Sequence, residues 1–269
     1  IDGEWGLGMR LDSVISLPRQ LMLGAVQDAA LAYQYGKLIG EQCKRMGIQV
    51  NFAPVVDVNN NPNNPVINDR SFGEDRYKVA LFGVQCMKGM QDVGVMACAK
   101  HFPGHGDTDT DSHLDLPVIN KTRPQLDSLE LYPFRELFHN GVGSVMIAHL
   151  YIPAIDNTKN VATSLSYNNV TKLLREELQY KGLTFTDALN MKGVSGFFKP
   201  GEINLKALLA GNDMLLFPED VPNAIKIIEN VNTWKDKTFK KGDIVKYRIK
   251  VINDKGWQSE FSEEVLVMF

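Results

Sequence analysis

The stretch VGVMACAKHFPGHGDTDTDSHLDLP, residues 93–117, joins an apolar run to a segment crowded with ionisable side chains. Residues 93–99 have the length and composition of a buried strand. Three histidines and four aspartates follow between Lys100 and Pro117. Ionisable groups at this density are solvated, bind a ligand or take part in chemistry. The stretch therefore predicts a buried strand with a polar segment at its end.

The same alternation recurs along the chain. Because the apolar runs alternate with segments of helical periodicity, we expect a parallel sheet that is buried on both faces. The predicted strands cover residues 48–58, 93–99, 144–151, 183–186 and 213–217. The predicted helices cover residues 21–46, 76–93, 124–139, 166–179, 202–210 and 221–231.

Polar side chains follow the predicted strands, namely Asp57, Lys100, His101, His149 and Asp187. In a parallel α/β fold all strand ends point the same way, so these groups should meet at one rim, where α/β barrels keep their active sites. We therefore predict an α/β fold of the (β/α)8 TIM-barrel type. An open, doubly wound sheet is the alternative.

The strand count falls short of a full barrel, which needs eight strands. The sequence predicts about five complete strands and the tail of another at Ile1 and Asp2. We therefore expect a partial barrel over residues 1–232 that is incomplete at its N-terminus. Residues 233–269 form a predicted β-rich tail, in which alternating residues 244–251 and 264–267 flank a turn at 253–256. This hairpin resembles the last two strands of a fibronectin type III domain, although such a sandwich needs about seven strands.

Composition limits the classes of partner. A net charge of −3 without a long basic block disfavours nucleic acid and anionic membranes. We find no secretory signal and no apolar run of the roughly 18 residues that a membrane span needs. The chain starts at Ile1 without a methionine, which leaves localisation open between the cytoplasm and the periplasm or secretion, and the oligomeric state is open too.

Three cysteines lie in apolar segments and are expected to be buried and structural: Cys43, Cys86 and Cys98.

A metal site is one interpretation of the polar segment. The acidic residues from Asp107 onward resemble a calcium loop, but Ser112 stands where glycine is required and Val118 where glutamate is required. Zinc is the other candidate, with His101, His105 and His113 as ligands. The segment has no helical pair of histidines, so we predict no metal and no cofactor.

Acid and base chemistry is the second interpretation. Asp111 and His113 are separated by one residue, so the carboxylate can orient the imidazole and raise its pKa. A solvated polar loop would explain the same residues. Asp187 ends a predicted strand and either caps the next segment or acts in chemistry. A positioned carboxylate and an independent proton donor are the two groups that glycosidic cleavage requires.

Several motifs resemble one enzyme family. Residues 100–108 followed by Asp111, Ser112 and His113 are similar to the signature of family 3 glycoside hydrolases of the β-N-acetylglucosaminidase (NagZ-like) branch. Residues 51–58, 68–73 and 186–191 resemble further segments of that family in order and spacing. The resemblance extends from about residue 2 to 230. One departure is Trp5, which stands where the family usually has glycine.

The resemblance implies a retaining hydrolase that releases terminal β-linked N-acetylglucosamine from cell-wall (peptidoglycan) or chitin-type fragments. It implies that Asp187 is the nucleophile and that His113 is the general acid/base, with Asp111 as its partner. It further implies that five residues bind the sugar: Asp2, Arg10, Arg70, Lys100 and His101. A β-glucosidase of the same superfamily and a non-catalytic carbohydrate-binding fragment are the alternatives.

Overall fold

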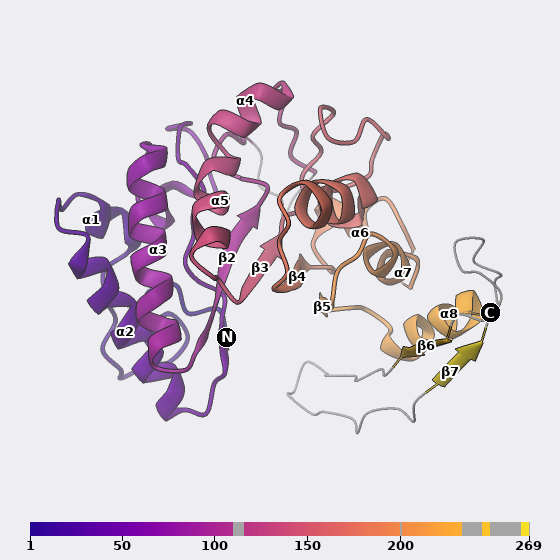
Figure 1. Cartoon of the computed structure of the whole chain (residues 1–269), viewed down its shortest axis with the longest axis horizontal. Coiled ribbons are helices and arrows are strands. Elements are labelled where there is room, and N and C mark those ends of the chain that lie inside the picture. The colour runs from indigo at the N-terminus through magenta and orange to yellow at the C-terminus, as the bar shows by residue number, and fades with distance from the viewer. Residues whose placement is uncertain (110–115, 200, 233–243, 248–264, 269) are drawn as a thin grey trace.

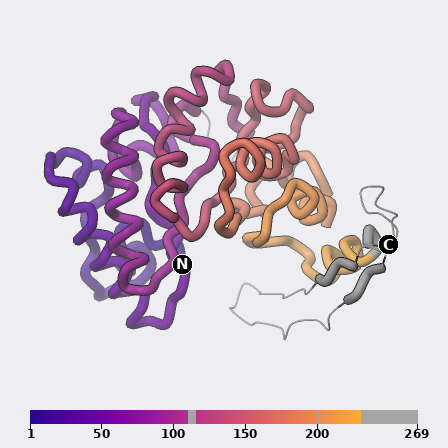
Figure 2. The backbone as a smooth tube through the Cα atoms, viewed as in Figure 1, coloured from indigo at the N-terminus to yellow at the C-terminus, as the bar shows by residue number. Residues whose placement is uncertain are grey.

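The computed structural model describes residues 1–109, 116–199, 201–232, 244–247 and 265–268. Their main feature is a curled, five-stranded parallel sheet with helices on its outer side (Figure 1). The strands are β1 (Val50–Asn51), β2 (Met96–Phe102), β3 (Ser144–Ile147), β4 (Leu183–Ala188) and β5 (Met214–Leu216). Figure 2 shows the chain advancing around the sheet from its N-terminus to the helix that follows β5.

The order of the strands distinguishes the two predicted architectures. Each strand pairs in parallel with its neighbour along the chain, in the order β1-β2-β3-β4-β5. A doubly wound sheet reverses direction at a switch point, whereas a barrel adds strands in sequence. The fold is therefore an incomplete TIM-type barrel, as predicted, and the doubly wound alternative is wrong.

Two predicted helices are each divided in two. Residues 21–46 form α1 (Gln20–Gly24) and α2 (Ala30–Arg45), and the Asp28 carboxylate accepts a hydrogen bond from the first N–H of α2. Residues 124–139 form α4 (Arg123–Ser128) and α5 (Leu131–His139). Pro133 is the reason for the second break, because proline in a continuous helix would clash with the carbonyl of Leu129.

The other predicted helices are found close to the expected bounds. They are α3 (Arg76–Asp92), the π-helical segment η4 (Asn168–Glu177), α7 (Glu202–Leu209) and α8 (Val221–Asn232). The short helix α6 (Lys192–Ser195) was not predicted. Short 3-10 turns are η1 (Leu7–Met9), η2 (Asn68–Arg70) and η3 (Thr163–Leu165). Among the described residues, no helix is long and apolar enough to cross a membrane.

Helices α2 and α3 approach closely because glycines remove side chains from their interface. A Cβ atom on Gly36 would collide with the carbonyl of Cys86, and one on Gly89 would collide with the carbonyl of Tyr33. Any larger residue at either position would force the helices apart. The three cysteines are free and buried, as predicted.

Strand boundaries differ from the predictions at two places. The predicted strand 48–58 pairs only at β1 and again at a bridge between Val55 and Lys100, because Pro54 has no N–H to donate to the ladder. Strand β2 runs on through Phe102, so Lys100 and His101 belong to the strand rather than following it.

Alternation along the strands places side chains on two sides of the sheet. Val145 and Ile147 belong to the large core beneath α2, α3 and α5, whereas Met146 packs in a separate cluster with Cys98 and Phe185. The second cluster lies on the inner side of the curled sheet. Asp187, two residues beyond Phe185, therefore faces the same inner side.

The C-terminal strands confirm part of the predicted tail. Strand β6 (Ile244–Tyr247) pairs antiparallel with β7 (Val265–Met268), as a hairpin requires. The predicted turn at 253–256 lies outside the described residues. The domain boundary at 232 and the fibronectin-like assignment of 233–269 stay predictions.

Candidate active site

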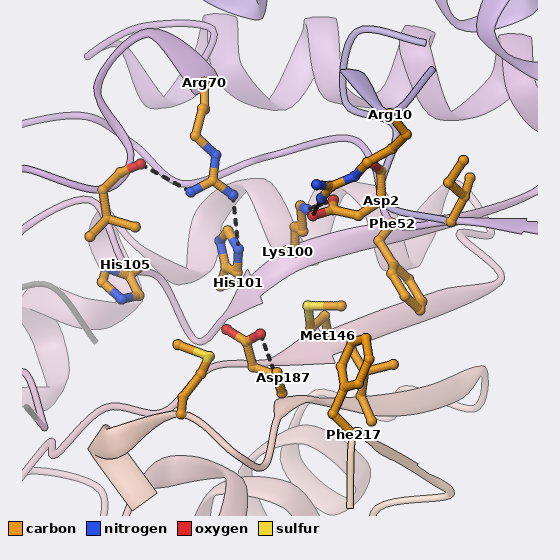
Figure 3. Close-up of a pocket in the computed structure, with 15 residues that line it drawn as sticks. Asp2, Arg10, Phe52, Arg70, Lys100, His101, His105, Met146, Asp187 and Phe217 are labelled. Carbon is orange, nitrogen blue, oxygen red and sulfur yellow. Dashed lines mark hydrogen bonds and ion pairs between the residues drawn. The ribbon is translucent and has the colours of Figure 1, made fainter. Parts of the chain in front are cut away.

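A cavity of about 480 Å³ opens at the carboxyl ends of the strands, on the inner side of the sheet (Figure 3). The structure brings six of the eight predicted site residues into its lining: Asp2, Arg10, Arg70, Lys100, His101 and Asp187. The other two, Asp111 and His113, lie outside the described residues. These six residues come from five separate parts of the chain, and the fold unites them.

The N-terminal segment reaches the cavity by running alongside β1. The Ile1 amino group donates to the Val50 carbonyl over 2.9 Å, and the Phe52 N–H donates to the Ile1 carbonyl over 2.8 Å. Asp2 is thereby held at the cavity edge. Arg10 follows η1 and donates to the Asp2 carboxylate over 2.7 Å.

A shift of register brings two consecutive residues of β2 to the cavity. The pairing of β2 with β3 is regular up to Ala99 and resumes at Phe102 with one extra residue in β2. Such a bulge re-aims the side chains next to it. Lys100 and His101 therefore both line the cavity, instead of pointing to opposite sides of the sheet.

Glu4, which was not among the predicted site residues, joins the cations of the site. This carboxylate is 1% exposed. Its Oε1 and Oε2 accept from Arg70 Nη2 and Nε over 2.6 and 2.9 Å, and Oε1 lies 2.7 Å from Lys100 Nζ. Lys100 Nζ also donates to Asp2 Oδ1 over 2.5 Å. An acidic residue two positions after Asp2 was the available signal.

Charge compensation in this network holds its members ionised. Burial alone would raise the pKa of Glu4, but Lys100 and Arg70 lower it well below its usual range. Burial alone would lower the pKa of Lys100, but Glu4 and Asp2 raise it. Arg70 and Lys100 are thus fixed in charge and direction at one side of the cavity. We use the name charged wall for these two cations and the ionised residues linked to them, so that it comprises Asp2, Glu4, Arg10, Arg70 and Lys100.

His101 lies between the charged wall and a second buried carboxylate, Asp57, which was predicted only as a polar residue after a strand. Asp57 is fully buried and lies 2.7 Å from His101 Nδ1, and it also accepts from the His105 N–H over 2.7 Å. On the other side, Arg70 Nη2 lies 3.3 Å from His101 Nε2. A guanidinium can only donate, so Nε2 accepts and the hydrogen is on Nδ1.

The remaining histidine of the cavity is neutral. Burial, together with the neighbouring His101, lowers the pKa of His105 to about 4. Its Nδ1 lies 2.9 Å from Thr108 Oγ1. For Asp57, burial would raise the pKa, but His101 and His105 lower it on balance.

Asp187 projects into the cavity from the end of β4, partly exposed (Figure 3). Its Oδ1 accepts a hydrogen bond from the Ala188 N–H over 2.8 Å. Burial would raise the pKa of Asp187, but the imidazoles of His149 and His101 and the Ala188 N–H lower it on balance. Asp187 is therefore ionised near neutral pH, as a carboxylate nucleophile must be.

The lining beside Asp187 and the polar groups is apolar, formed by Phe52, Met146, Leu216 and Phe217. A cavity with convergent polar groups on one side and apolar side chains on the other suits a small polar ligand with an apolar face, such as a sugar ring. Within the described residues, no group of three or more His, Cys, Asp or Glu side chains is arranged to hold a metal ion.

TIM-barrel enzymes have their active sites at the carboxyl ends of the strands. This half-barrel carries Asp187 and its fixed cations at that rim, which is the arrangement of a barrel enzyme. Comparison with known families is specific: residues 1–250 match the family described as glycosyl hydrolase family 3 N terminal domain. The chain belongs to glycosyl hydrolase family 3.

Curated relatives are named as hexosaminidases. Beta-hexosaminidase A of Pseudoalteromonas piscicida is 40% identical over 242 residues, which are 84% of this chain and 40% of that protein. A beta-hexosaminidase of Nitrosospira multiformis is 34% identical over 225 residues, which are 80% of this chain and 63% of that protein. This chain therefore spans between 40% and 63% of the length of these two relatives.

Solved structures agree with these relatives. A glycoside hydrolase family 3 β-N-acetylglucosaminidase from Paenibacillus sp. str. FPU-7 is similar with a TM-score of 0.82 and 44% identity, over 86% of this chain and 44% of that chain. The β-N-acetylglucosaminidase from Thermotoga maritima is similar with a TM-score of 0.76 and 32% identity, over 88% of this chain and 51% of that chain.

Proposed function

We propose that this chain carries the catalytic barrel of a retaining glycoside hydrolase that releases terminal β-linked N-acetylglucosamine. The observation that carries the proposal is the shared cavity, in which an ionised Asp187 faces the charged wall and His101. The names of the family relatives, β-hexosaminidase and β-N-acetylglucosaminidase, support the same activity. Cell-wall and chitin-type fragments are the proposed substrates.

The proposed mechanism is a double displacement. Asp187 attacks the anomeric carbon and forms a covalent glycosyl-enzyme intermediate while the leaving oxygen receives a proton. His113, oriented by Asp111, is the proposed donor of that proton and the base that later activates water. Both residues lie outside the described residues, so their part in the mechanism rests on the sequence motif.

The charged wall suits the binding step. Arg70 and Lys100 offer charge-assisted hydrogen bonds to sugar hydroxyls or an acetamido oxygen, and Asp2 accepts from hydroxyls. Glu4 holds both cations before a ligand arrives. A sugar therefore meets donors whose positions are already fixed, which reduces the entropy that binding costs.

Turnover of p-nitrophenyl β-N-acetylglucosaminide by the 269-residue chain tests the proposal. We expect release of p-nitrophenol, with the β-anomer of the sugar as first product by proton NMR. Asp187→Asn should lower kcat at least about 10³-fold, because the nucleophile is lost. Asp92→Asn, an exposed carboxylate at the far end of α3, is the matched control and should leave kcat unchanged.

Three results would contradict the proposal. Preferred turnover of the β-glucoside would indicate the β-glucosidase alternative. Calorimetric binding of N-acetylglucosamine without any turnover would indicate a non-catalytic carbohydrate-binding protein. Unchanged turnover in Asp187→Asn would exclude Asp187 as the nucleophile.

A further inference from the structure

His149 lies beneath Asp187 and takes no part in the proposed double displacement. It follows β3 and is fully buried. Its ring makes two hydrogen bonds to groups that are far apart in sequence. Nδ1 lies 2.7 Å from Ser164 Oγ, and Nε2 lies 3.0 Å from the Ala188 carbonyl oxygen.

These two contacts fix the tautomer of the ring. A carbonyl oxygen only accepts, so Nε2 carries the hydrogen that bonds to Ala188. In a neutral ring Nδ1 is then an acceptor and the Ser164 hydroxyl donates to it. Burial lowers the pKa of His149 although the neighbouring Asp187 opposes the effect, which favours this neutral form.

Ala188 is thereby held on both of its polar groups. Its N–H donates to Asp187 Oδ1 over 2.8 Å, while its carbonyl accepts from His149. The next N–H, that of Leu189, donates to the Leu216 carbonyl over 2.9 Å. The direction of the Asp187 carboxylate therefore depends on the position of the Ala188 backbone, which the hydrogen bond from His149 holds in place.

The support under His149 is itself fixed. Ser164 belongs to η3, and Thr163 of the same turn donates from its N–H to the Leu150 carbonyl and from Oγ1 to the Ala148 carbonyl, each over 2.7 Å. The Asn212 side chain donates to the Ser164 carbonyl over 2.8 Å. The turn that carries the Ser164 hydroxyl is thus hydrogen-bonded to the segment that follows β3 and to Asn212, just before β5.

We propose that His149 is a positioning residue for Asp187: its ring, oriented by Ser164, holds the Ala188 carbonyl and so keeps the Asp187 carboxylate directed into the cavity. The proposal rests on the proposed function in one respect, namely that Asp187 is the nucleophile. His149 does not line the cavity, and its ring forms hydrogen bonds to Ser164 and Ala188. Its effect is on the geometry of attack.

Kinetics of three variants test this role. His149→Phe keeps the ring shape but removes the donor, and we expect kcat to fall about 10- to 100-fold with KM changed less than about 2-fold, because small displacements of a reacting group have effects of this size. His149→Gln can still donate to Ala188 and accept from Ser164, so it should recover most of the lost kcat. Ser164→Ala should give an intermediate loss.

His139→Gln, an exposed histidine at the end of α5, is the matched control and should behave as the unmodified chain. The rate at which a fluorinated mechanism-based inhibitor labels Asp187 should fall in parallel with kcat in His149→Phe.

Unchanged kcat in both His149→Phe and Ser164→Ala would overturn the proposal. Equal losses of kcat in His149→Gln and His149→Phe would also overturn the proposal. Such a result would show that the hydrogen bond donated to the Ala188 carbonyl does not matter for kcat. If His149→Phe fails to fold, unchanged kcat in Ser164→Ala alone would overturn the proposal, because that variant removes the hydroxyl that orients the ring.

A second measurement does not depend on activity. Nitrogen-15 NMR of the chain with labelled histidine should show His149 as the neutral Nε2–H tautomer at neutral pH. The His149→Gln spectrum assigns the signal. The Nδ1–H tautomer or an imidazolium would contradict the proposal. If the unmodified chain shows no turnover, the proposed function fails by itself, and the tautomer still decides whether the ring holds Ala188.

Discussion

The charged wall and the support of Asp187 are two sides of one cavity, and they are built in different ways. In the charged wall, opposite charges compensate one another, as in the contacts of Glu4 with Arg70 and Lys100. Beneath Asp187 the contacts are neutral, from His149 and from the Ala188 N–H. Asp187 forms no ion pair with any other described residue. The residues of the charged wall are thus held by opposite charges, whereas Asp187 is held through hydrogen bonds of neutral groups.

Removing the charge of Glu4 should have the largest effect on stability. In Glu4→Gln, Arg70 and Lys100 would share a buried site without their common anion, and breaking a buried pair in this way costs about 3–5 kcal/mol. We expect that loss in the free energy of unfolding by urea denaturation, together with a raised KM. Glu41→Gln, on the exposed surface of α2, should change stability by less than about 0.5 kcal/mol. A loss no greater than in Glu41→Gln would show that the charged wall is not held by Glu4.

The neutral histidines should make stability depend on pH. The pKa of His105 is about 4 in the folded chain, lowered by burial and His101, against about 6.5 when unfolded. Between these values the unfolded chain binds a proton that the folded chain does not. Stability therefore falls as the pH decreases from about 6.5 to 4, with a slope of up to about 1.4 kcal/mol per pH unit from this group.

Urea denaturation at about pH 7 and about pH 5 measures that slope. His105→Gln should show a shallower dependence than the unmodified chain, and His139→Gln should show the same dependence as the unmodified chain. An equal slope in His105→Gln would mean that His105 takes up its proton in the folded state too.

Arg10 should show the smallest effect on stability. Its pair with Asp2 is about half exposed, with 47% of the Arg10 side chain accessible, and exposed pairs contribute about 0–1 kcal/mol. Arg10→Ala should therefore leave the urea midpoint nearly unchanged while raising KM several-fold. A stability loss as large as in Glu4→Gln would remove the distinction between the buried and exposed parts of the charged wall.

Much of the site could be predicted from local sequence. Lys100 and His101 lie at the end of an apolar run, and Asp187 lies near the end of another, so their place at the rim followed from the direction of parallel strands. Glu4, Asp57 and His149 could not be assigned roles in this way. Their partners are 66, 44 and 39 residues away along the chain. No periodicity connects residues at such separations.

The helix boundaries show the same limit. The apolar period of residues 21–46 was real, but it did not reveal the break before α2, where Asp28 accepts from the Ala30 N–H. The order of the strands was also beyond the sequence pattern, since alternating strands and helices suit both a barrel and a doubly wound sheet. Pairing of consecutive strands resolved this choice.

Local sequence patterns predicted the α/β class and the rim on which polar groups gather, because these depend on periodicity and on strand direction. The roles of the motif residues came from the resemblance to a known family. The tertiary structure alone decided that the sheet curls, that Lys100 and His101 both enter the cavity, and which charges compensate one another. These features depend on register and on contacts between distant segments. The neutral ring of His149 beneath the ionised Asp187 is such a feature, since burial sets the state of the histidine and the partner on each nitrogen sets its tautomer.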